Sequence, residues 1–168
     1  MLYLIRHVQT TISSVFPATT TAATVTMETG MSPIEHGWLG WSLFFDEIGA
    51  NVNNFSSTLF GTDGEPAAEY HVARRYLPYK SVQEKNYETG RAEAHHISVF
   101  TAHSQSVEEI CDSVASLCGR DGIKYIYTYW HQPDYDIHGL GTRHEQITAD
   151  IRQINELVEK MCARFQIR

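Results

Sequence analysis

The second half of the chain carries a strand–helix–strand pattern, and this pattern restricts the fold class more than any other feature of the sequence. Residues 97–100 (ISVF) form a short apolar run typical of a buried strand, and residues 123–129 (IKYIYTY) are rich in strand-forming residues. Between them, residues 107–118 follow a Ser-x-x-Glu capping box and repeat apolar side chains at helical intervals. Consecutive strand, helix and strand predict a parallel βαβ unit, so we expect an α/β fold with a mainly parallel sheet flanked by helices.

A long amphipathic helix is predicted at the C-terminal end. Thr142 and Glu145 have capping-box spacing, and apolar side chains then recur at helical intervals from residue 147 to residue 165. The chain has 168 residues, of which 42% are hydrophobic and 20% charged. This length and composition predict one globular domain, residues 1–168, with a core of its own.

Net charge and cysteine usage narrow the partners and the compartment. The net charge of −7 argues against a nucleic-acid polymer or an anionic membrane as the main partner. Cys111, Cys118 and Cys162 are an odd number of cysteines without Cys-x-x-Cys spacing. They predict reduced thiols in a cytoplasmic protein. The sequence has no apolar run long enough for a signal peptide or a membrane span.

A threonine cluster in the first half is the first candidate site. Residues 10–16 (TTISSVF) predict a strand that runs into Pro17, and Thr19, Thr20 and Thr21 follow it. A helix is expected from about Thr21 to Thr29, ending at Gly30. Hydroxyl groups at a helix N-terminus can cap the helix, hold a phosphate or provide a nucleophile, and the pattern alone leaves these alternatives open.

The region between this cluster and the βαβ pattern is less informative. Residues 38–54 predict a strand–turn–strand element, residues 66–76 a helix and residues 78–91 a polar loop. His95, His96 and His103 lack metal-ligand spacing, so we expect surface and loop histidines there.

A second candidate site lies between the last predicted strand and the long helix. Residues 130–141 (WHQPDYDIHGLG) are expected to form a loop that carries Asp134 and His138, with Asp136 and His131 as alternatives. A carboxylate and an imidazole on one loop provide half of a zinc-type site. The other interpretation is a polar turn in which Asp134 caps and His138 faces water.

Taken together, the two sites resemble a known family. The first site supplies Phe-Pro, a small residue and threonine, then Thr29-Gly30, Pro33 and His36-Gly37; the second supplies Pro133-Asp134, His138 and Gly141. In order and spacing these segments resemble the alkaline phosphatase superfamily, and within it the type I phosphodiesterase/nucleotide pyrophosphatase family. The resemblance covers about residues 10–53 and 123–160.

The resemblance implies a function and roles for residues. Thr20 would be the nucleophile, with Thr19 or Thr21 as alternatives if the register is shifted. Asp134 and His138 would bind one of two zinc ions, and Thr20 would approach the other. The implied activity is metal-dependent hydrolysis of a small-molecule phosphate mono- or diester, and the oligomeric state is left open.

Several family elements have no counterpart here, and this changes the expectation for activity. The family has a strand ending in a metal-binding aspartate, a phosphate-binding asparagine after the threonine, and a later Asp-His-Gly segment and histidine. We therefore expect an alkaline phosphatase-like core that is incomplete at both ends, with weak metal binding and impaired turnover. A non-catalytic remnant or interaction module is the alternative.

A second resemblance concerns the first ten residues. Residues 2–10 (LYLIRHVQT) are similar to the opening strand of the histidine phosphatases, in which His7 would accept the phosphoryl group without a metal. That family has glycine after the histidine, whereas this chain has Val8. A β-branched residue suits a close-approach turn poorly, so this alternative ranks below the first.

Overall fold

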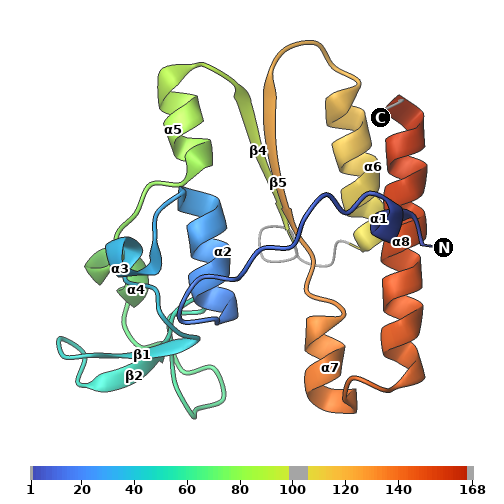
Figure 1. Ribbon diagram of the computed structural model, residues 1–168. Coiled ribbons are helices and arrows are strands. Elements are labelled where there is room, and N and C mark those ends of the chain that lie inside the picture. The colour runs from blue at the N-terminus through green and yellow to red at the C-terminus, as the bar shows by residue number, and fades with distance from the viewer. Residues whose placement is uncertain (1, 99–105, 166–168) are drawn as a thin grey trace. The chain divides into compact units, whose positions relative to one another are not determined.

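The computed structural model describes residues 2–98 and 106–165, which form two compact units (Figure 1). The terminal unit comprises Met1–Thr11 and Thr89–Arg168, and the central unit comprises Ile12–Glu88. A single domain over residues 1–168 stays a prediction.

The terminal unit contains the predicted βαβ element. Strand β4 (Glu93–Ser98) pairs in parallel with β5 (Lys124–Tyr129), and helix α6 (Val107–Cys118) connects them. The capping box of α6 is formed as expected: Ser106 N donates to Glu109 Oε2 at 2.8 Å, and Glu109 N donates to Ser106 Oγ at 3.1 Å. The predicted strand at 97–100 begins four residues earlier, and its last two residues lie outside the described part of the chain.

Helix α8 (Glu145–Phe165) organises the rest of the terminal unit. It packs against α6, against α7 (Asp134–Leu140) and against the short α1 (Tyr3–Arg6). Figure 1 shows α6 between the strand pair and α8. The predicted Thr142 cap is wrong, because the helix begins at Glu145 and the His144 ring accepts a hydrogen bond from Gln146 N at 3.2 Å.

The central unit is built around an antiparallel sheet. Strands β1 (Ser42–Phe45), β2 (Ala50–Asn53) and β3 (Thr58–Leu59) lie in that order, and the predicted strand–turn–strand at 38–54 is thus confirmed. The helices of the unit are α2 (Thr20–Thr29), α3 (Pro33–His36), α4 (Val72–Tyr76) and α5 (Val82–Thr89). Helix α5 occupies the segment predicted as a polar loop, and α4 is shorter than the predicted helix at 66–76.

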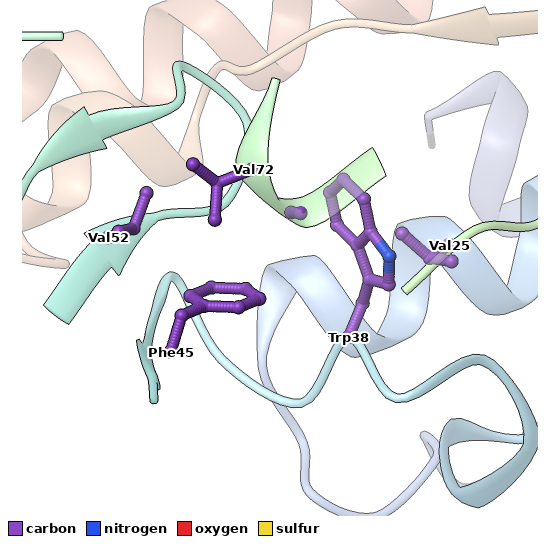
Figure 2. Close-up of a cluster of buried hydrophobic side chains, with 6 residues drawn as sticks. Val25, Trp38, Phe45, Val52 and Val72 are labelled. Atoms are coloured by element: carbon purple, nitrogen blue, oxygen red, sulfur yellow. The ribbon is translucent and has the colours of Figure 1, made fainter. Parts of the chain in front are cut away.

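The core of the central unit surrounds Trp38. Figure 2 shows Val25, Trp38, Phe45, Val52 and Val72, which together with Ala73 form the buried cluster. Trp38 is 1% exposed, and its indole Nε1 donates to Leu77 O at 2.9 Å. The core therefore draws on α2, two strands and α4, and it supports the C-terminal half of α2.

The predicted mainly parallel sheet is wrong. Within residues 2–98 and 106–165, parallel pairing is confined to β4 and β5, and the larger sheet is antiparallel. Residues 10–16, predicted as a strand, are irregular chain that pairs with none of the described strands, and Ile12 and Phe16 are 90% and 92% exposed. Strand-forming residues need a neighbouring strand to complete their hydrogen bonds, and the described part of the chain places none beside this segment.

Two further observations bear on the alternatives raised by the sequence. Residues 3–6 form helix α1 instead of the strand that a histidine phosphatase would have, and His7 follows it, exposed, with Nδ1 2.8 Å from Tyr3 O. Among the described residues, no helix combines the length and the apolar character needed to cross a membrane.

Candidate functional site

Thr19 caps the N-terminus of α2. Its φ of −108° and ψ of 153° are extended, and its Oγ1 accepts a hydrogen bond from Ala22 N at 3.2 Å. The same hydroxyl donates to Leu39 O at 3.0 Å. Since its single proton and one lone pair are both engaged, the Thr19 hydroxyl has a structural role.

Thr20 and Thr21 differ from Thr19 and from each other. Thr20 is the first residue of α2 and is half-buried, and its hydroxyl makes no hydrogen bond with another described residue. Thr21 is fully buried, and its Oγ1 has no hydrogen-bond partner. The amides of both residues are at the free end of the helix, where no backbone acceptor is available to them. Among the three threonines, Thr20 thus has the hydroxyl that a ligand could reach.

The Thr-Gly pair ends α2. Thr29 Oγ1 donates to Val25 O at 2.7 Å and accepts from Met31 N at 3.0 Å. Gly30 has a φ of 72°, in the left-handed region, and its amide donates to Thr26 O at 2.8 Å. These contacts form a helix C-cap, which glycine adopts with little strain.

The segment that follows is held by a capping box. Ser32 N and Ser32 Oγ donate to Glu35 Oε2 at 2.7 Å and 2.6 Å, and Pro33 is the first residue of α3. The hydrogen bonds from Ser32 lower the pKa of the Glu35 carboxyl, because they favour its charged form. Glu35 is therefore engaged as a cap.

His36 is buried and neutral. The residue is 2% exposed, Nδ1 accepts from Trp38 N at 3.0 Å, and Nε2 lies 3.2 Å from Thr26 Oγ1. An acceptor at Nδ1 requires the proton on Nε2, and burial lowers the pKa of the ring. Gly37 follows with a φ of 74°, and a Cβ there would lie 2.9 Å from Leu77 Cδ2. The His-Gly pair thus closes α3 onto the core.

The predicted metal ligands lie on a helix instead of a loop. Asp134 and His138 are one turn apart on α7, with His138 Nε2 3.6 Å from Asp134 Oδ2. Their side chains are 66% and 80% exposed. The segment is predicted as a loop because it contains Gly139 and follows Pro133. Pro133, however, directly precedes the first turn of α7, where proline is tolerated. The structure therefore brings these two donors together on one exposed face.

Their two alternatives are engaged elsewhere in the terminal unit. Burial, a hydrogen bond with Asp150 and the charge of Asp150 raise the pKa of Asp136. The ring of His131 contacts Trp130 and Tyr135, with centroids 4.9 Å and 5.5 Å away. In the described ranges, three or more side chains of the metal-binding types do not gather at any one point. Asp134 and His138 remain the pair with accessible donor atoms.

Sequence reasoning missed the segment that Thr19 contacts. Leu39, Gly40 and Trp41 lie beside the N-terminus of α2 because of the bond from Thr19 to Leu39, which spans 20 positions in the sequence. No local pattern signals such a contact. Thr20 belongs to the central unit, and Asp134 and His138 belong to the terminal unit.

Comparison with known proteins places this chain in a family. The family model for type I phosphodiesterase/nucleotide pyrophosphatase matches residues 4–168. The chain belongs to this family. The family predicted from the threonine segment and the Asp134–His138 segment is thus confirmed.

A solved structure agrees in fold. The chain is similar to murine ectonucleotide pyrophosphatase/phosphodiesterase 5, in an inactive threonine-to-alanine variant in complex with AMP, with a TM-score of 0.64 and 12% sequence identity. The match covers 92% of this chain and 43% of that chain, so this chain spans less than half the length of its relative. At this identity the likeness concerns the fold alone. No curated protein sequence matches the chain.

Proposed function

We propose that the chain carries the threonine segment and one metal-ligand pair of a metal-dependent hydrolase of phosphate mono- or diesters. Family membership supports the reaction class. The observation that carries the proposal is the state of Thr20, whose hydroxyl is uncommitted at the free end of a ten-residue helix. The relative bound to AMP favours a small phosphate ester of the nucleotide type as substrate.

In this proposal Thr20 is the nucleophile. Its Oγ1 forms a bond to phosphorus, the bond between phosphorus and the leaving oxygen breaks, and the hydroxyl proton passes to water. Water then hydrolyses the phosphothreonine and restores the hydroxyl. The amides of Thr20 and Thr21 donate to the phosphoryl oxygens, and the positive end of the α2 dipole stabilises their charge.

Asp134 and His138 would hold the zinc ion. Their oxygen and nitrogen are zinc donors, and an Oδ2–Nε2 separation of 3.6 Å is compatible with both atoms binding one ion at about 2 Å each. When bound, zinc supplies Lewis-acid polarisation of a phosphoryl oxygen. Two donors are fewer than the three or four that zinc sites use, so we expect the isolated chain to bind zinc weakly.

Hydrolysis of bis(4-nitrophenyl) phosphate and 4-nitrophenyl phosphate in the presence of zinc tests the proposal. Thr20→Ala removes the nucleophile and is expected to abolish any zinc-dependent turnover, whereas Thr20→Ser retains a hydroxyl and part of the activity. Thr24→Ala is the matched control, because Thr24 lies on the same helix and its hydroxyl is bonded to Thr20 O at 2.8 Å. Equal zinc-dependent activity in Thr20→Ala and the unmodified chain would refute the assignment.

Zinc titration by calorimetry tests the metal pair separately. Asp134→Asn and His138→Gln are each expected to weaken zinc binding, and Asp63→Asn, on an exposed turn of the central unit, should leave it unchanged. Tight binding of two zinc ions by the unmodified chain would contradict the expectation of an incomplete site. Zinc binding that does not change in either variant would remove Asp134 and His138 from the proposal.

The second candidate is a non-catalytic remnant of the family. The observation that favours it is the lack, among the described residues, of a group of three metal-binding side chains. This candidate predicts no hydrolysis of either nitrophenyl ester at any zinc concentration, so the first assay separates the two functions.

A further inference from the structure

The segment Leu39–Trp41 beside the N-terminus of α2 is held at each of its three carbonyl groups. Leu39 O accepts from Thr19 Oγ1 at 3.0 Å. Gly40 O accepts from Asn54 Nδ2 at 2.6 Å, and Trp41 O accepts from Asn54 N at 2.8 Å. Asn54, which directly follows β2, therefore supplies two of the three bonds that place this segment.

Asn54 is fully buried, and its side chain is only partly satisfied. It is 0% exposed, and its Oδ1 has no hydrogen-bond partner. Burying an oxygen without a partner costs stability, so the side chain is not explained by packing alone. Its side-chain Nδ2 donates to Gly40 O, and this hydrogen bond is the contribution that distinguishes asparagine from an apolar residue of similar size.

The position of Leu39 O determines how Thr19 caps the helix. The Thr19 hydroxyl has one proton, which it donates to Leu39 O, and this orientation leaves a lone pair for Ala22 N. If Leu39 O moved, the hydroxyl would lose the partner that orients it. The first turn of α2, where Thr20 lies, would then lose its cap.

We propose that Asn54 is a positioning residue for the Thr20 end of α2. It acts through Leu39–Trp41 and Thr19, and it holds the Thr20 hydroxyl and the amides of Thr20 and Thr21 in the arrangement that receives a phosphoryl group. The inference rests on the proposed function of Thr20, because it concerns the same site.

Amide–water exchange in the ¹⁵N-labelled full chain tests the inference without metal or substrate. Asn54→Asp keeps the shape of the side chain but replaces the amide donor with an oxygen facing Gly40 O. We expect exchange of the Ala22 amide to rise about fivefold or more, as for the loss of one hydrogen bond. The Gly30 amide, which donates to Thr26 O at the other end of α2, should exchange at its original rate.

Variants of Thr19 provide the matched controls. Thr19→Val should reproduce the local effect of Asn54→Asp, and Thr19→Ser, which retains the hydroxyl, should not. Because both residues act through Leu39–Trp41, the double variant Asn54→Asp/Thr19→Val should exchange at Ala22 no faster than Thr19→Val alone. If Asn54→Asp does not fold, Asn54→Leu takes its place, since it removes the donor together with the unpaired oxygen.

The outcomes separate a positioning role from a merely structural one. Equal acceleration of amide exchange at Ala22 and Gly30 would mean that Asn54 only stabilises the central unit. Unchanged amide exchange at Ala22 would mean that Asn54 does not hold the Thr19 cap. Either result overturns the inference. Absence of hydrolysis in the zinc assays would refute the proposed function and leave the exchange result standing. In a chain that does turn over, Asn54→Leu should lower kcat and leave KM nearly unchanged.

Discussion

Protonation of His36 should destabilise the central unit. The neutral ring accepts a hydrogen bond from Trp38 N at 3.0 Å through Nδ1 and is 2% exposed. A proton on Nδ1 would face the Trp38 amide proton, and that buried amide would lose its acceptor. The cost of such an unpaired group is about 1–3 kcal/mol.

The direction of the pH dependence follows from the lowered pKa of His36. The unfolded chain takes up the proton near its ordinary pKa of about 6.5, whereas the folded unit takes it up only at lower pH. The contribution of neutral His36 is therefore fully present above about pH 6.5 and is lost as the pH falls below that value. The loss reaches at most about 1.4 kcal/mol per pH unit for one proton.

Urea unfolding at pH 7.5 and pH 5.0 measures this effect. Tryptophan fluorescence reports mainly on the central unit, which contains Trp38 and Trp41. His36→Asn is the comparison variant, because its Oδ1 can accept from Trp38 N and does not titrate. We expect the unmodified chain to lose more stability than His36→Asn between the two pH values. An equal loss in the two proteins would refute the reasoning.

Two further predictions concern local backbone signals. Gly37→Ala should lower the thermal stability of the central unit more than Gly30→Ala does. Both glycines have positive φ, but only at Gly37 would the new Cβ approach Leu77 Cδ2, at 2.9 Å. Equal losses of thermal stability in the two variants would contradict this prediction. Ser106→Ala should cost about 1 kcal/mol, measured by urea unfolding followed by circular dichroism, since it removes the acceptor for Glu109 N. Exposed Ser116→Ala is its control.

Several elements could be predicted from the sequence because their signals are local. Helix α6 has its capping box and its apolar spacing within the consecutive residues 106–118, and strand β5 is rich in strand-forming residues. The end of α2 at Gly30 depends on one residue that adopts positive φ easily. In each case the groups that decide the structure are neighbours along the chain.

The errors have a common physical origin. Residues 10–16 have the composition of a strand, but none of the strands in residues 2–98 and 106–165 pairs with them. Residues 78–91 are an exception, because their helix has a local signal: Ser81 and Glu84 have capping-box spacing, and Ser81 N donates to Glu84 Oε2 at 2.7 Å just before α5 begins at Val82. Residues 134–140 contain a glycine and follow a proline, and the helix forms nevertheless, where α7 packs against α8. Contacts made outside a segment can override its own preference.

The sequence by itself determined the family, the helix that follows the threonine cluster, and the pairing of an aspartate with a histidine four positions later. These follow from residue types at fixed spacing. Only the tertiary structure distinguished the three threonines, because the partner of Thr19 is Leu39 O, twenty positions away, and the burial of Thr21 depends on packing within the central unit. It also placed Asp134 and His138 on one face of a helix, where a separation of four positions brings Oδ2 and Nε2 to 3.6 Å. Spacing along the chain specifies chemistry, whereas the availability of each group depends on neighbours that folding supplies.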